Sequence, residues 1–309
     1  MNFIKPITIT SAMIAAGTSI AEPASGETAW VSGATYALDA EVIRATTHRR
    51  YVAKQAHSGR SQLPEQDGAY WADVGPTQRW APFDQYVSTG ASATTSLTYV
   101  LRPGYVNAMS LYGLVGTSIS ITLKDEPGGT TIYSQSGPLF EDPAGWYEYL
   151  FIPPPPITKL SRSNLPIRPD AEITITVSAA SGQPVGIGMI VLGDLVDLVG
   201  DRSEFGGTEY GAQAEPVTFS YIKTDEFGET TIVRRHRSTN LSAKIILPSA
   251  KTDEAIRQIQ DVLDLPVAWI AKPNIRGFGG LNVFGLGSAR VTYEGPGLSR
   301  IDLSVKGMI

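Results

Sequence analysis

The side chains that could carry out chemistry in this chain of 309 residues are few and scattered. Cysteine is absent, which excludes thiolate metal ligands, thiol nucleophiles and disulfides. His48, His57 and His236 lie far apart, and none belongs to a pair spaced to place two metal ligands on one helix face. The glycine patterns of dinucleotide-binding and phosphate-binding loops and the Gly-x-Ser-x-Gly elbow are also missing. The sequence therefore predicts no enzyme activity, no metal and no cofactor.

Carboxylates are the remaining route to catalysis. A glycosidase needs only two carboxylates at a suitable separation. Asp67, Asp73 and Asp84 lie within or next to a run rich in aromatic residues, "YWADVGPTQRWAPFDQY", at positions 70–86. Because spacing along the chain does not give a distance in the fold, these three acids stay candidates for glycan cleavage.

The charge balance argues against nucleic acid or membrane as the main partner. The chain has 25 basic and 30 acidic residues, a net charge of −5, so no general attraction to polyanions is expected. Two basic clusters, at 44–50 and 233–237, are expected to form the solvent face of a strand pair or a salt-bridged contact between subunits. The longest apolar run, 184–200, is short and contains two aspartates, so no membrane insertion is predicted.

The N-terminal segment permits two interpretations. An apolar run follows Lys5 and ends near Ser19 and Ala21, small residues placed as at a signal-peptide cleavage site. Pro6 and several hydroxyl residues interrupt this run, which favours a segment that stays attached. We therefore expect an initial strand-like run followed by a loop or arm, while cleavage after Ala21 remains the alternative.

Most of the remaining sequence predicts β-strands. Glycine (31) and proline (21) are abundant, as is typical of β-proteins with many turns. Short alternating runs follow Trp30 and longer ones follow Phe83, each bounded by turn residues. The segment "WYEYLFIP" at 146–153 is predicted as one of these strands, and the four prolines at 153–156 as an extended connection.

One segment, "TDEAIRQIQDVLDLP", has a convincing helical pattern. Thr252 is placed to cap this helix, and Pro266 to end it. Ile256, Ile259 and Leu263 fall on one face, which we expect to be buried.

These patterns predict a mainly β protein in four parts. Residues 1–29 form an N-terminal arm, 30–84 a small β domain, and 85–200 an antiparallel β-sandwich of jelly-roll type. Residues 201–309 form a C-terminal α+β unit with one helix on a β-sandwich or split barrel.

The aromatic residues of the small domain follow a recognisable order. Trp30, Tyr36, Tyr51 and Trp71 occupy positions that resemble the pattern of chitin-binding-type carbohydrate modules, although Asp39–Ala40 stands where that family usually has Gly-Asp. The resemblance implies that these four aromatics are candidate glycan-binding residues. Such rings either fill a small core or stack on sugars, and periodicity does not decide between the two uses.

The decapeptide "GPTQRWAPFD", at 75–84, resembles a signature of structural proteins of tailed bacteriophages, approximately Gly-Pro-Thr-Asn-Arg-Trp-Ala-Met-Phe-Asp. In those proteins it follows a module of this type and precedes a β-sandwich. The resemblance implies that Trp80 and Phe83 fill the junction while Arg79 and Asp84 fix it by polar contacts. We call this expected joint between the domains the clasp.

Together the resemblances imply a non-enzymatic virion component of a phage tail tip or baseplate, made in the host cytoplasm. Its C-terminal unit, which is similar to the one-helix β-sandwich of tail-tube and distal-tail proteins, would assemble with copies of itself or with other tail proteins. Bacterial surface polysaccharide is a further expected partner. A secreted, lectin-like carbohydrate-binding protein and a glycan-cleaving tail enzyme are the alternatives.

Overall fold

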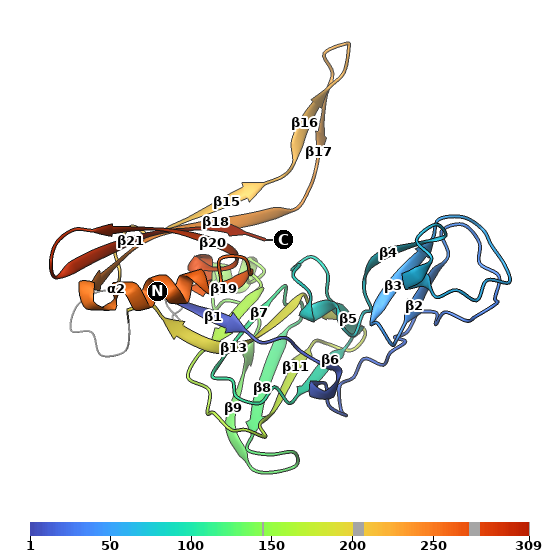
Figure 1. The fold of residues 1–309 in the computed structure, drawn as a ribbon, viewed down its shortest axis with the longest axis horizontal. Helices are drawn as coiled ribbons and strands as arrows, with labels where there is room; N and C mark the ends of the chain where they lie inside the picture. The colour runs from blue at the N-terminus through green and yellow to red at the C-terminus, as the bar shows by residue number, and fades with distance from the viewer. Residues whose placement is uncertain (144, 200–206, 272–278, 309) are drawn as a thin grey trace.

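The computed structural model describes residues 1–143, 145–199, 207–271 and 279–308. The protein is mainly β, as the sequence predicts. Its largest element is an antiparallel sheet in the order β10-β7-β13-β1-β19-β20-β21-β18-β14, with β15 also paired to β18 (Figure 1). The strands are β1 (Asn2–Pro6), β7 (Ala108–Tyr112), β10 (Lys159–Arg162), β13 (Met189–Asp197), β14 (Gly207–Thr208), β15 (Gln213–Thr218), β18 (Arg237–Pro248), β19 (Val267–Ile270), β20 (Asn282–Tyr293) and β21 (Leu298–Gly307).

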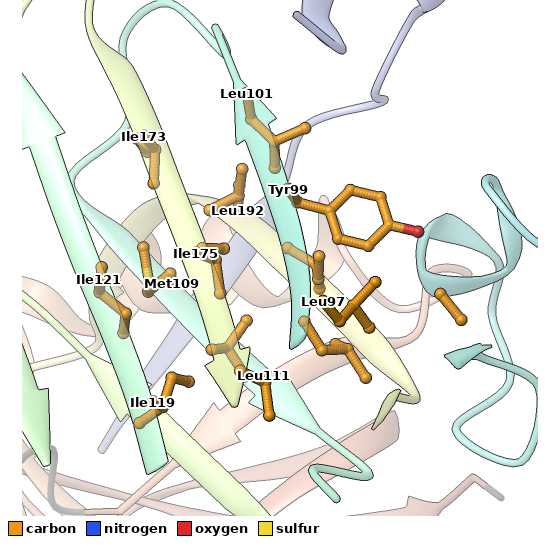
Figure 2. Packing of buried hydrophobic residues seen from close by; sticks show 14 of the residues in the cluster. Leu97, Tyr99, Leu101, Met109, Leu111, Ile119, Ile121, Ile173, Ile175 and Leu192 are labelled. Atoms are coloured by element: carbon orange, nitrogen blue, oxygen red, sulfur yellow. The ribbon is translucent and has the colours of Figure 1, made fainter. Parts of the chain in front are cut away.

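A second sheet, in the order β6-β11-β8-β9, packs on the β7–β13 end of the large sheet and completes the sandwich. Alternating residues of β11, such as Ile173 and Ile175, point into the core, where they meet Met109 and Leu111 of β7 and Leu192 of β13 (Figure 2). This is the inward and outward alternation that the sequence predicts for the segment. The strands are β6 (Ser96–Leu101), β8 (Ser118–Lys124), β9 (Thr131–Pro138) and β11 (Glu172–Ser178).

The N-terminal strand joins the two larger predicted units. β1 pairs with β13 of the sandwich on one side and with β19 of the C-terminal unit on the other. Phe3 and Ile4 are both buried and belong to different core clusters, so both faces of β1 are covered. The expected boundary at residue 200 therefore does not divide the sheet, although residues 200–206 themselves lie outside the described residues.

The predicted C-terminal helix is α2 (Thr252–Gln260), but its details differ from the expectation. Its buried side is made by Ala255, Ile259 and, just past the helix end, Val262, whereas Leu263 is exposed. The prediction that Thr252 caps the helix is wrong. A 3-10 turn at Ser249–Lys251 leads directly into the helix, so Thr252 already has helical backbone angles and cannot take the extended conformation of a cap.

The prediction of a strand at 146–153 is also wrong, because the segment forms a short helix, α1 (Trp146–Phe151). Leu139 and Ile157 are joined by a backbone hydrogen bond of 2.8 Å, which closes a loop outside the sheets. The segment therefore has no neighbouring strand to pair with. The prolines at 153–156 form the exposed return of this loop, in line with an extended connection.

Three small sheets complete the fold. The small domain is built on β2-β3-β4, the sandwich rim carries β5-β12, and a separate hairpin is formed by β16-β17. No helix among the described residues is long and apolar enough to cross a membrane. The strands are β2 (Glu41–Arg44), β3 (Arg49–Ala53), β4 (Trp71–Pro76), β5 (Ala91–Thr94), β12 (Pro184–Ile187), β16 (Tyr221–Thr224) and β17 (Thr230–Val233).

Candidate functional site

The clasp segment lies between the small domain and the sandwich. It begins with the last two residues of β4 and contains a 3-10 turn at Ala81–Phe83, where Pro82 fixes the backbone near helical angles. Trp80 and Phe83 are partly buried and pack against the sandwich core. The ring of Phe83 meets that of Tyr99 edge-on at 5.6 Å between centroids, and the Tyr99 hydroxyl donates to the carbonyl of Arg79 at 3.0 Å.

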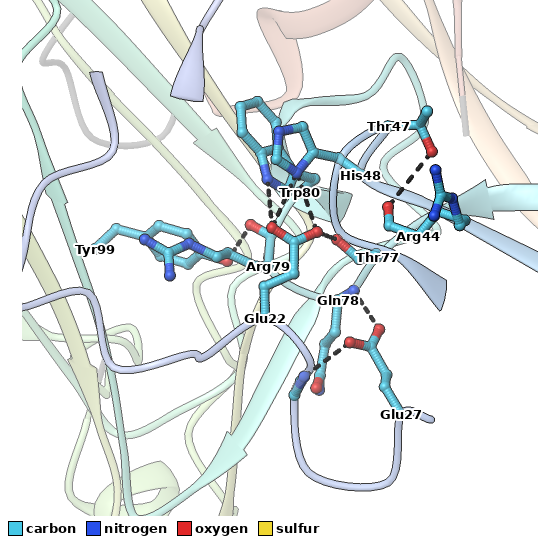
Figure 3. A network of polar contacts seen from close by, with 11 residues as sticks. Glu22, Glu27, Arg44, Thr47, His48, Thr77, Gln78, Arg79, Trp80 and Tyr99 are labelled. Carbon is cyan, nitrogen blue, oxygen red and sulfur yellow. Dashed lines mark hydrogen bonds and ion pairs between the residues drawn. The ribbon is translucent and has the colours of Figure 1, made fainter. Parts of the chain in front are cut away.

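The polar centre of the clasp is Glu22, a residue of the predicted arm. Its side chain is only 10% exposed, and it faces three groups of the small domain and the clasp (Figure 3). Its Oε1 accepts from the Thr77 hydroxyl at 2.7 Å, and its Oε2 accepts from Trp80 Nε1 at 3.2 Å and lies 2.9 Å from His48 Nδ1. The His48 ring also stacks on Trp80 at 4.1 Å. One carboxylate thus ties together segments distant in the sequence.

A second carboxylate of the arm repeats this arrangement. Glu27 Oε1 accepts from the backbone N–H of Gln78 at 2.8 Å, and its Oε2 accepts from the backbone N–H of Ala24 at 2.8 Å. Gln78 in turn donates through its amide to the carbonyl of Ser92 in β5, at 2.8 Å. Glu27 therefore links the N-terminal arm to the clasp, and Gln78 links the clasp to the sandwich.

The remaining predicted clasp residues act locally. Asp84 accepts from the Thr89 hydroxyl and, at 2.8 Å, from the backbone N–H of Tyr86. Burial raises the pKa of Asp84, and these hydrogen bonds oppose the increase. Arg79 takes part through its backbone carbonyl, which accepts from Tyr99. Sequence reasoning missed Glu22, which lies 55 positions before Thr77, because no local pattern connects the two.

The four aromatic residues proposed for glycan binding differ in their surroundings. Tyr51 and Trp71 are 4% and 2% exposed and form the core of the small domain, so neither ring offers a face for a sugar. Trp30 and Tyr36 are partly buried against that core. The Tyr36 hydroxyl hydrogen-bonds with the backbone of Val31, whereas Trp30 lies under the guanidinium of Arg44 at 5.2 Å.

The three candidate acids each lie beside an arginine or a hydroxyl group of the described structure. Asp67 is buried and bonded to Arg60 at 2.8 Å, whereas Asp73 pairs with Arg49 at 2.8 Å. Asp84 lies in the clasp. Arg49 also acts on Asp84, where its charge favours a lower pKa, so Asp73 and Asp84 share a neighbouring cation while Asp67 is paired with Arg60.

The first basic cluster forms ion pairs within the small domain of the single chain. Its arginines at 44, 49 and 50 pair with carboxylates at distances of 3.2, 2.8 and 3.9 Å, namely those of Glu65, Asp73 and Glu41. Within the described ranges, no group of three or more histidines and acids is arranged to hold a metal ion.

A polar cleft of about 510 Å³ opens where the arm, the small domain and the start of the sandwich meet. Glu41 and Arg50 line it from the small domain, Glu27 from the arm and Gln78 from the clasp. Several serine and threonine residues complete its walls, so hydroxyls, carboxylates, an amide and a guanidinium line it together with some aliphatic side chains. Groups of this kind bind polar ligands rich in hydroxyls.

The most unusual surface feature is a projecting hairpin, which we call the β-arm (residues 219–236). It continues the β15–β18 pair beyond Thr218 and Arg237 and extends away from the body of the protein (Figure 1). Every residue of β16 is exposed, and Phe227 at the turn is 90% exposed. The other large apolar side chains exposed here are Phe219, Tyr221, Ile222 and Ile232.

Comparisons of the chain with protein-family models, with curated proteins and with solved structures found no match. The function must therefore be argued from the clasp, the cleft and the β-arm themselves.

Proposed function

We propose that this chain is a non-enzymatic structural subunit of a phage tail tip or baseplate, assembling with copies of itself and with other tail proteins. The observation that carries the proposal is the β-arm. A two-stranded hairpin is at best marginally stable alone in water, and this one exposes five large apolar side chains at positions 219–232. Such a surface is typical of a segment that is covered in an assembly.

The rigid body behind the β-arm suits the same role. β1 joins the sandwich and the C-terminal unit in one sheet. Glu22 and Glu27 of the N-terminal arm (residues 1–29) fix the small domain to the sandwich. A building block of this kind keeps its contacts at fixed relative positions. The clasp sequence, with its resemblance to a signature of phage structural proteins, supports the choice of a tail particle.

Contact with host glycans is the second part of the proposal. The polar cleft beside the clasp and the partly buried rings of Trp30 and Tyr36 support it. The same observations favour the alternative function, a secreted lectin-like protein that binds glycans as a single copy. The two proposals differ in whether the chain assembles.

The register of the β-arm allows a clean test of assembly. Thr218 and Arg237 are directly paired, so residues 219–236 can be replaced by Asn-Gly, the two-residue turn that such a pair accepts. We expect the full chain to form defined oligomers in sedimentation velocity and the shortened chain to stay monomeric with an unchanged circular dichroism spectrum. A monomeric full chain, or equal assembly of both, would contradict the proposal.

Glycan contact and tail location need separate measurements. Binding of the full chain to bacterial surface polysaccharide should weaken on Trp30→Ala or Tyr36→Ala and stay unchanged on Tyr105→Ala, which alters an exposed ring in the sandwich. A monomer that binds polysaccharide would favour the lectin-like alternative. Density for this chain in a map of the tail would test its location directly.

A further inference from the structure

A cavity of about 290 Å³, which we call the foot pocket, lies where the β-arm joins the large sheet. Its floor is apolar, because Tyr112, Val283 and Phe284 line it and are buried. Its mouth is basic, because the lining residues His236 and Arg237 are exposed. The volume is at the lower end of the range for small-molecule sites, so the foot pocket suits a single large side chain.

Lys159 adds a third basic group to the foot pocket. Its Nζ donates to the carbonyl of Asn282 at 3.2 Å, and burial lowers its pKa. Among the described residues no carboxylate lines the pocket, and none forms an ion pair with Lys159, His236 or Arg237. The basic groups therefore have no acidic partner within the described chain. A carboxylate supplied by another molecule would stabilise their charged forms.

The tip of the β-arm carries the opposite charge. The β-arm contains three acids and three bases, so its formal charges cancel, but they are separated along its length. All three acids lie at the turn between β16 and β17, with one lysine beside them, whereas both arginines lie at the foot. The tip is therefore acidic and the foot basic. The acids are Asp225, Glu226 and Glu229, the lysine is Lys223, and the arginines are Arg234 and Arg235.

The turn holds the tip in a defined conformation. Asp225 Oδ1 accepts from the backbone N–H groups of Phe227 and Glu229 at 2.9 and 2.8 Å. Gly228 has a φ of 83°, which glycine adopts without strain. Asp225 thus orders the turn, while the side chains of Glu226 and Glu229 stay exposed and Phe227 is 90% exposed. The tip presents one aromatic ring between two carboxylates.

We propose that the tip of the β-arm of one copy docks in the foot pocket of another copy. Phe227 contacts the apolar floor, and Glu226 and Glu229 meet the basic groups, which is the complementarity of two halves of one interface. This inference rests on the proposed assembly and identifies its acceptor surface. The contact allows two copies to exchange tips in a closed pair, or each copy to pass its tip to the next in a ring.

The length of the hairpin requires a second copy. From Phe219 to Phe227 the chain runs roughly 26 Å, at about 3.3 Å per residue. His236 and Arg237 of the foot pocket lie at the start of this length, next to Phe219, whose backbone N–H donates to the carbonyl of His236 at 3.1 Å. The tip of the same copy is therefore one hairpin length away from its own pocket.

The test reverses the charges of the two surfaces in separate variants. The tip variant carries Glu226→Lys and Glu229→Lys, and the pocket variant carries His236→Glu and Arg237→Glu. All four side chains are exposed, so both variants should fold as the wild type does.

At about 100 µM protein we expect each reversed variant alone to associate at least about 30-fold more weakly than the wild type in sedimentation velocity, because like charges then meet. An equimolar mixture should associate again, since the new lysines of one variant face the new glutamates of the other. A chain with all four substitutions should also associate with itself. The matched control, Glu126→Lys with Arg168→Glu, makes the same kinds of charge change at exposed positions of the sandwich and should assemble as the wild type does.

Other results would overturn the inference. If the wild type associates and either reversed variant associates equally well, the proposed assembly stands but uses another contact. A mixture that stays monomeric, or weakened association in the control, would also contradict the docking. If the pocket variant assembles normally but loses inorganic phosphate binding that the wild type shows in calorimetry, the foot pocket holds a small anion instead. A wild type that never associates would remove the proposed assembly as well.

Discussion

Removing the Glu22 carboxylate should open the joint between the small domain and the sandwich. The carboxylate accepts hydrogen bonds from Thr77 and Trp80, and Thr77 is fully buried. In Glu22→Ala both donors lose their acceptor, at about 1–2 kcal/mol each. The His48 side chain, by contrast, is 28% exposed, so its ring nitrogen can form a hydrogen bond with water in place of the carboxylate. We therefore expect a loss of about 3 kcal/mol in the free energy of unfolding.

Glu22→Gln separates the hydrogen bonds from the charge. The Trp80 indole can only donate, so the amide oxygen should take the place of Oε2, while the amide nitrogen faces the Thr77 hydroxyl, which can accept. Both contacts survive and only the charge assistance is lost, at about 1 kcal/mol. Glu126→Gln, on an exposed turn, is the matched control and should change stability by less than about 0.5 kcal/mol.

The assay combines urea unfolding with hydrogen–deuterium exchange. Urea midpoints give the loss of stability. Exchange should rise at 19–30 and 77–84 in Glu22→Ala and stay near wild type elsewhere, because the joint opens before the sandwich does. A Glu22→Ala variant with the same stability and the same exchange rates as the wild type would refute this reasoning. So would a Glu22→Gln variant as unstable as the alanine one, since that result would make the charge, not the buried donors, responsible.

Two further predictions concern the large sheet. Burial lowers the pKa of Lys159, so the folded chain holds this proton less tightly than the unfolded chain and stability should rise with pH between the folded and unfolded pKa values. Lys159→Met should remove that rise and be more stable than the wild type at pH 7, as measured by urea unfolding at several pH values. If the free energy of unfolding changed with pH in the same way in the variant and the wild type, the prediction would be contradicted. At Gly287 a Cβ would lie 2.9 Å from Cε2 of the fully buried Trp269, so Gly287→Ala should lower stability by about 1–3 kcal/mol. An unchanged melting temperature would show that the ring can shift.

Short-range patterns predicted much of the secondary structure. Alternation identified β11, and the helical pattern identified α2, since both depend on residues close in sequence. The strand predicted at 146–153 is wrong. The composition of the segment favours a strand, but the hydrogen bond between Leu139 and Ile157 closes it into a loop, so it has no neighbouring strand to pair with. Thr252 fails as a cap because the preceding turn already sets its backbone.

The sequence by itself determined the class of the fold and the position of the clasp. Turn residues and alternation are local, and the resemblance of 75–84 to a phage structural signature implied that Trp80 and Phe83 fill a junction, where they pack against the sandwich core. It also placed Tyr51 and Trp71 in a small aromatic set, without deciding between core and sugar contact.

Only the tertiary structure decided that β1 joins two units in one sheet and that Glu22 holds the clasp. It also decided that Tyr51 and Trp71 are buried and that the large apolar side chains of the β-arm and of helix α1 are exposed. The physical reason is the same in each case. Strand pairing between distant segments, the satisfaction of a buried donor and the exposure of an apolar side chain depend on which segments meet, and the spacing of residues along one segment does not contain that information.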